Sequence, residues 1–159
     1  MELASSISTR LHYQHKSLLD IIEGQSDEQI RRQLVPGKWS IFENIVHVQT
    51  YQHTFVSRVN LILTTHNPIF PRYTAEADPM FLDNCSKSTW EIIQDMMTTR
   101  KDMSGVMQSF NVADLNKTGE HPVYGCMTLV QWINFFLLHE AHHLFTIFKL
   151  TGELRKEAR

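Results

Sequence analysis

A repeated signal for the start of a helix constrains the fold of this chain most strongly. Three segments begin with a Ser or Thr that is followed three residues later by Glu or Gln, which is the capping-box pattern. The pairs are Ser40 with Glu43, Ser88 with Glu91, and Thr128 with Gln131. After each box, apolar residues recur at spacings of three and four, as on the buried face of an amphipathic helix. The pattern predicts helices at 40–64, 88–110 and 128–152, with Gly152 ending the last one.

An amphipathic segment near the N-terminus predicts a fourth helix. Apolar side chains recur at helical spacing over residues 3–22, and Gly24 follows the last of them. A short helical turn is expected at 26–34. Residues 111–126 contain two glycines and a proline and are expected to form a loop. No strand pattern competes with the helices, so we expect one all-α domain over residues 1–159.

The connection at 65–87 is much longer than the usual link between adjacent antiparallel helices, and it contains three prolines. At about 3.3 Å per extended residue, it can run back along the whole of the preceding helix, which spans about 37 Å. We therefore expect the helices at 40–64 and 88–110 to be parallel. The predicted fold is a four-helix bundle with one long crossover connection, an established variant of this architecture.

Composition limits the classes of function. Of the 159 residues, 42% are apolar and 20% are charged, and the formal charge is −2. These values are typical of a globular domain and do not favour nucleic-acid binding through bulk charge. No apolar run approaches the roughly 20 residues that span a membrane, and the N-terminus lacks the apolar core of a signal peptide. Without a C-x-x-C pair, the two cysteines are expected to be ordinary thiols of a cytoplasmic protein.

Two histidines one helical turn apart are the strongest functional signal. His139 and His143 lie on the apolar face of the last predicted helix, with Cβ atoms expected about 5–6 Å apart, so both imidazoles can bind one ion. His47 is the candidate third ligand, because it lies seven residues after Ser40 while His143 lies eight residues before Thr151. If these two helices are antiparallel, His47 and His143 lie at the same depth in the bundle. Three protein ligands and an opening to solvent are typical of a catalytic metal site.

The alternative is that these three are ordinary helix histidines without a ligand. We keep that interpretation for His12, His15, His53 and His66, which are expected at the surface or in loops. His142 is expected on the other side of its helix from the convergence point.

Residues 139–143 also match H-E-x-x-H, in which two histidines bind zinc and the glutamate is the general base of a peptidase. The context does not fit, because only 16 residues follow His143 and no strand-built cleft precedes the helix. Glu140 falls about 100° from His139 around the helix, where it orients a ligand or pairs internally. A zinc peptidase is therefore the least favoured function.

Over almost its whole length the sequence resembles the DinB superfamily. The matching residues are Pro36-Gly37-Lys38-Trp39-Ser40 before Glu43 and His47, then His121-Pro122 to Gly125 and Thr128, and His139 to His143. The resemblance implies an up-down-down-up bundle, a divalent metal such as zinc or nickel on His47, His139 and His143, and a possible homodimer. Members of this superfamily include metal-dependent S-transferases that use low-molecular-weight thiols, a thiol-dependent isomerase and proteins described as hydrolases.

Three functions follow from this site, each with a small molecule as the partner. The first expectation is an enzyme whose metal binds a low-molecular-weight thiol as the thiolate and transfers it to an electrophile. The second is a metal-dependent hydrolase that uses a metal-bound water. The third is a non-catalytic bundle that binds a metal or another ligand. No residue is assigned a catalytic role, and no motif for a serine nucleophile, a P-loop or a dinucleotide is present.

Overall fold

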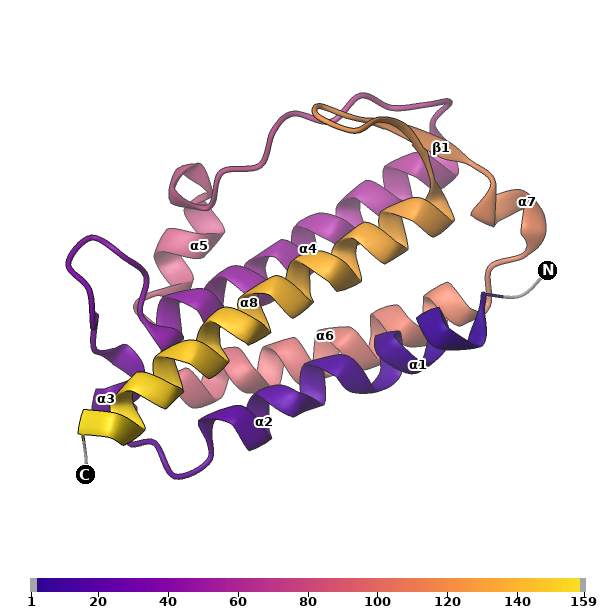
Figure 1. Cartoon of the computed structure of the whole chain (residues 1–159). Coiled ribbons are helices and arrows are strands. Elements are labelled where there is room, and N and C mark those ends of the chain that lie inside the picture. Colours follow the sequence, from indigo (N-terminus) through magenta and orange to yellow (C-terminus); the bar gives the residue numbers. More distant parts are fainter. Residues whose placement is uncertain (1–2, 158–159) are drawn as a thin grey trace.

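Four long helical segments lie side by side in the computed structural model, which describes residues 3–157 (Figure 1). They are α1 (Ser5–Tyr13) continued through the 3-10 turn η1 (Gln14–Lys16) into α2 (Ser17–Ile22), then α4 (Ile41–Thr64), α6 (Thr89–Gln108) and α8 (Leu129–Glu157). α1 and α8 run in one direction and α4 and α6 in the other (Figure 1). The predicted four-helix bundle with parallel second and third helices is confirmed.

The capping boxes start the helices where the sequence places them. Ser40 and Ser88 each accept a hydrogen bond from the backbone N–H three residues later, and the side chains of Glu43 and Glu91 return the bond. At the start of α8, the backbone N–H of Thr128 donates to Gln131 Oε1 over 2.8 Å. These bonds satisfy backbone donors that the first helical turn leaves without partners.

Two helix predictions are wrong in detail. The N-terminal helix is not continuous, because the chain tightens into η1, where the Ser17 hydroxyl donates to the Gln14 carbonyl over 2.7 Å. Gly152 does not end α8, which continues to Glu157 with Thr151 and Leu154 buried. The segment after Gly152 still carries a buried face, so packing extends the helix beyond the glycine.

The crossover and the other connections are more ordered than expected. They contain α3 (Asp27–Arg31), η2 (Ala75–Ala77), α5 (Pro79–Asn84) and α7 (Val112–Leu115). The predicted loop at 111–126 also contains most of an antiparallel hairpin of β1 (Thr118–His121) and β2 (Gly125–Thr128). The expectation that the chain has no strands was wrong, because strands of four residues are too short to show a clear alternation.

The hairpin packs over one end of α4 and α8, beside the crossover (Figure 1). The crossover joins its edge, since the backbone N–H of Phe70 donates to the Glu120 carbonyl over 3.1 Å and the N–H of Glu120 donates to the Pro68 carbonyl over 2.8 Å. The hairpin and the crossover together form a cover over this end of the bundle.

Within residues 3–157, no helix combines the length and apolar character needed to cross a bilayer. The apolar side chains instead face the bundle interior, where the rings of Phe55 and Phe136 stack with centroids 4.5 Å apart. Trp132 is fully buried beside them. Burial of such rings supplies much of the stability of a domain of this size.

Gly119 is a position where the hairpin backbone lies close against buried side chains of α4 and the crossover. A Cβ at this position would lie 2.8 Å from Phe70 Cε2 and 2.9 Å from Ile62 Cγ1, and both side chains are buried. The Gly119 carbonyl also accepts a hydrogen bond from Trp132 Nε1 over 3.2 Å. A side chain larger than hydrogen would therefore collide with Ile62 of α4 and Phe70 of the crossover.

We expect Gly119→Ala to lower the free energy of unfolding by about 1–3 kcal/mol, because it overpacks this contact. Gly152→Ala is the matched control: it lies in a helix with no atom within 4 Å of its Cβ, and should stabilise the protein by up to about 1 kcal/mol. Urea denaturation followed by circular dichroism measures both. Equal effects of the two substitutions would contradict the close approach of the hairpin.

Candidate metal centre

The antiparallel helices α4 and α8 bring the three predicted histidines together. His47 Nε2 and His139 Nε2 lie 3.1 Å apart. The ring centroid of His143 is 4.4 Å from that of His47 and 4.7 Å from that of His139. One nitrogen from each ring can be chosen so that all three lie within 4.8 Å of one another. The expectation that His47 and His143 lie at the same depth is therefore confirmed by the geometry.

Asn44 fixes the orientation of the His143 ring. His143 Nδ1 lies 2.9 Å from Asn44 Oδ1, and the Asn44 side-chain amide donates to the Ser40 carbonyl over 2.8 Å. Because the amide oxygen only accepts, His143 donates from Nδ1, which leaves Nε2 with a free lone pair. A hydrogen bond of this kind orients histidine ligands in metal sites.

Burial keeps all three imidazoles uncharged. Desolvation and, to a smaller extent, the neighbouring His143 lower the pKa of His47 to about 3. Burial likewise lowers the pKa of His139 to about 3, with smaller effects from His47, His142 and Arg58. The pKa of His143 is lowered to about 3 by burial and by His139 and His142. At neutral pH the rings are therefore unprotonated, as a histidine must be to bind a cation.

The donor set fits a divalent ion with nitrogen ligands, such as zinc or nickel. Nitrogens bound at about 2.0–2.1 Å to one tetrahedral ion lie about 3.3 Å apart, close to the separation of His47 and His139. His47 Nδ1 is buried and has no hydrogen-bond partner among the described residues. When Nε2 of each ring is unprotonated, the lone pairs of His47 and His139 point at one another over 3.1 Å, and a shared cation can accept both.

A cavity of about 590 Å³ opens beside the three histidines. Its walls come from α4 and α8, from the crossover with Tyr73 and Glu76, and from the β1–β2 hairpin with His121. The volume is in the range of small-molecule sites, about 300–1,000 Å³. The arrangement provides three histidines that could hold a metal ion on one side and room for a small molecule on the other.

The remaining histidines lie largely where expected, with one exception. His12, His66 and His142 are exposed, and His53 is half-buried with Nε2 2.7 Å from Asp95 Oδ2. His15 was expected at the surface or in a loop, but it is buried in η1. Burial and the nearby Arg100 lower its pKa to about 3. The expectation failed because the 3-10 turn rotates His15 into the bundle.

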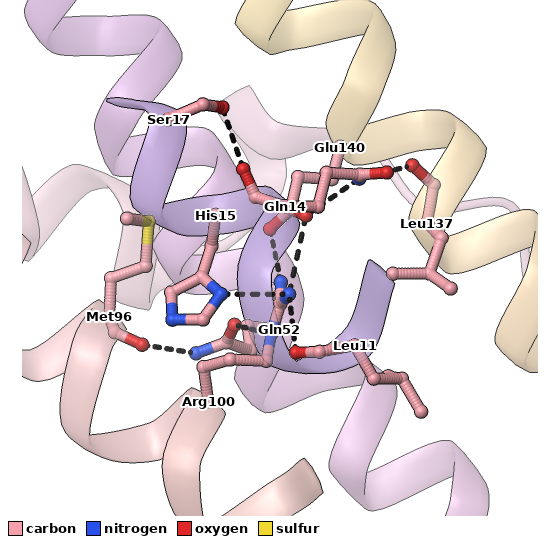
Figure 2. A network of polar contacts seen from close by, with 9 residues as sticks. All are labelled: Leu11, Gln14, His15, Ser17, Gln52, Met96, Arg100, Leu137 and Glu140. Atoms are coloured by element: carbon pink, nitrogen blue, oxygen red, sulfur yellow. Dashed lines mark hydrogen bonds and ion pairs between the residues drawn. The ribbon is translucent and has the colours of Figure 1, made fainter. Parts of the chain in front are cut away.

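Glu140 lies in the bundle interior on the side of α8 away from the cavity. Figure 2 shows its carboxylate meeting the guanidinium of Arg100, with Gln14 and Gln52 around the pair. Gln14 Nε2 donates to Glu140 Oε2 over 2.8 Å, and Arg100 Nε donates to Gln52 Oε1 over 2.9 Å. Both charged side chains are essentially inaccessible, with exposed fractions of 1% for Glu140 and 0% for Arg100. Since Glu140 pairs internally, it is not placed to act as the base of an H-E-x-x-H peptidase.

With the geometry established, the chain can be assigned to a family. The sequence profile of the DinB superfamily matches residues 10–147, and the chain belongs to that superfamily. A similar solved structure is YfiT from Bacillus subtilis, described as a probable metal-dependent hydrolase with an unusual four-helix bundle topology. The two chains share 16% sequence identity with a TM-score of 0.81, over 94% of this chain and 86% of YfiT. At this identity the likeness shows a common fold. No functionally curated protein matches the sequence.

Several residues of the site were not assigned a role from the sequence. Tyr51 places its ring 4.4 Å from that of His139, and Tyr73 reaches the cavity from the crossover. Arg58 is buried in the cavity wall. Asn44, Tyr51 and Arg58 lie three residues before, four after and eleven after His47, so helical periodicity could have found them. Tyr73 carries no such signal, because only the tertiary fold brings the crossover there.

We expect Glu140→Gln to lower the free energy of unfolding by about 3–5 kcal/mol, because it leaves the Arg100 charge buried without a counterion. The surface pair of Arg32 and Glu157 offers a matched control, and Glu157→Gln should cost about 1 kcal/mol or less. Guanidinium denaturation measures both. Similar costs at the two sites would contradict the role assigned to the buried pair, as would a double variant Arg100→Met with Glu140→Leu that is no more stable than Glu140→Gln.

Proposed function

We propose that this protein is a divalent-metal-dependent hydrolase that acts on a small molecule. One observation carries the proposal: three uncharged histidines converge beside an open cavity of about 590 Å³. Three protein ligands with room for a further ligand are typical of catalytic metal sites. The description of YfiT as a probable metal-dependent hydrolase supports the same reaction class.

His47, His139 and His143 would hold the ion, with zinc or nickel the expected metals. A bound ion of this kind lowers the pKa of a coordinated water and polarises the carbonyl of a substrate. Asn44 keeps His143 in the orientation that directs Nε2 to the ion, and the rings of Trp39 and Tyr51 pack against the ligands and limit their movement.

His121 offers a hydrogen-bond donor in the same cavity. Its Nδ1 accepts from the backbone N–H groups of Val123 and Tyr124 over 3.1 and 3.2 Å. The neutral ring therefore carries its proton on Nε2. Burial and the charge of Arg58 lower the pKa of His121, which keeps the ring in this neutral form. An N–H in the cavity wall can stabilise negative charge that develops on a substrate oxygen.

Transfer of a low-molecular-weight thiol to an electrophile is the second candidate. The observation that favours it is the scarcity of bases: among the described residues that line the cavity, only Glu76 has a carboxylate, and it is exposed. A thiol that binds the metal as the thiolate needs no protein base during its attack. Hydrolysis and thiol transfer would use the same three histidines.

Hydrolysis should depend on the metal and on its ligands. With 4-nitrophenyl acetate and small lactones as substrates, activity should rise as zinc or nickel is added up to one equivalent, and fall on chelation. His139→Ala should lose most of the bound metal and of the activity. His142→Ala, an exposed histidine on the same helix, is the matched control and should keep both. Metal analysis and absorbance assays provide the two measurements.

Ester hydrolysis that persists after chelation and in His139→Ala would contradict the proposal. The second candidate has its own readout in the cobalt-loaded protein, titrated with cysteine and glutathione. Thiol transfer would replace hydrolysis as the proposed function if three results occur together. These are a new thiolate-to-metal absorption band, conjugation of the thiol to 1-chloro-2,4-dinitrobenzene, and no ester hydrolysis.

A further inference from the structure

Arg58 is a buried cation in the cavity wall. It lies on α4 with an exposed fraction of 6%. Its Nη1 donates to the Tyr51 hydroxyl over 3.3 Å, and its Nη2 donates to the Pro71 carbonyl over 3.1 Å. Both acceptors are uncharged. Among residues 3–157, no carboxylate lies within ion-pair distance of this guanidinium.

The other buried arginine of the bundle, Arg100, has the counterion that Arg58 lacks. Arg100 is fully buried, and it is paired with the carboxylate of Glu140. Arginine stays charged in proteins, and a buried charge without a counterion costs several kcal/mol. The ring faces of Tyr51, Phe70 and Trp132 lie 5.4–5.8 Å from the Arg58 guanidinium and offset only part of that cost.

Arg58 also has hydrogen-bonding capacity to spare. A guanidinium carries five N–H donors, and the hydrogen bonds to Tyr51 and Pro71 use two of them. Arg72 is an exposed residue that also lines this cavity. The charged residues of the lining are therefore two arginines and one glutamate, Glu76. His121 adds the Nε2 donor described above. The cavity therefore favours a ligand with a negative charge.

The distance between Arg58 and the histidines sets the shape of that ligand. Arg58 lies eleven residues after His47, or roughly 16 Å along the axis of α4. Its side chain reaches back toward the N-terminus of the helix, as the hydrogen bond to Tyr51 requires. The Tyr51 ring in turn lies 4.4 Å from that of His139. The Tyr51 side chain therefore connects Arg58 with the histidine site, and a ligand that touches both must span about the length of that side chain.

We propose that Arg58 binds the carboxylate of an elongated small substrate whose reactive group lies at the three-histidine site. The proposal rests on the proposed function for the reaction, but the carboxylate site itself can be tested without turnover. A planar guanidinium pairs with a carboxylate through two parallel N–H bonds, which suits the donors left free on Arg58. The carboxylate would supply the missing counterion.

The test compares 4-phenylbutyrate with its uncharged amide, 4-phenylbutyramide, by isothermal titration calorimetry on the full chain. Each probe is titrated into zinc-loaded and into chelator-treated protein. We expect the carboxylate to bind at least about tenfold more tightly than the amide to both the zinc-loaded and the metal-free protein, because the carboxylate pairs with Arg58 and does not bind the metal. Arg58→Gln should reduce this preference to near unity, and Arg58→Lys should keep part of it.

Lys149→Gln is the matched control, since it removes one exposed cation from α8 outside the cavity and should leave the preference unchanged. Equal binding of acid and amide to the parent protein would overturn the proposal. So would a preference that disappears on chelation and survives Arg58→Gln, which would place the carboxylate on the metal. If the Arg58 variants do not fold, the affinities of the acid and the amide for the metal-free parent protein decide. A preference for the acid supports the anion site, and equal affinities overturn it. A carboxylate preference without ester hydrolysis would reject the proposed reaction and keep the anion site.

Discussion

α4 and α8 pack side by side in opposite directions, and the site depends on this pairing. It places His47 of one helix at the depth of His139 and His143 of the other. Because α4 and α6 are parallel, the chain must return along the bundle before α6 begins, and the returning segment runs beside α4 (Figure 1). Its residues 72–76 line the same cavity as the three histidines. The crossover that the topology requires thus becomes the wall of the cavity, together with the β1–β2 hairpin.

The polar interior of the bundle has two parts with different roles. On the side of α8 away from the cavity, Arg100 and Glu140 neutralise each other and, through Gln14 and Gln52, link η1, α4, α6 and α8 (Figure 2). Glu140 follows His139 directly in the chain but pairs with Arg100 outside the cavity, so the H-E-x-x-H pattern is a coincidence of two separate functions on one helix. On the cavity side, Arg58 has only uncharged acceptors. The first arrangement stabilises the fold, whereas the second suits recognition of an anion.

Local signals in the sequence were sufficient for the helices and for the three histidines. The capping boxes located the starts of α4, α6 and α8, and the i, i+4 spacing with a depth-matched partner located three histidines that converge in the structure. Features set by tertiary contacts were missed. The burial of His15 depends on a 3-10 turn that packs against Arg100, and the two short strands form because the hairpin pairs with itself and with the crossover. Gly152 favours the end of a helix, but α8 continues past it because Leu154 is buried against the bundle.

The central claim is that His47, His139 and His143 bind one divalent ion and leave part of its coordination sphere to small ligands. X-ray absorption spectroscopy at the zinc edge of the metal-loaded protein tests this most directly. The account predicts nitrogen or oxygen ligands at about 2.0–2.1 Å, with the outer-shell scattering of three imidazoles and at least one further light-atom ligand. Sulfur at about 2.3 Å from Cys85 or Cys126, or scattering from fewer than three imidazoles, would contradict it.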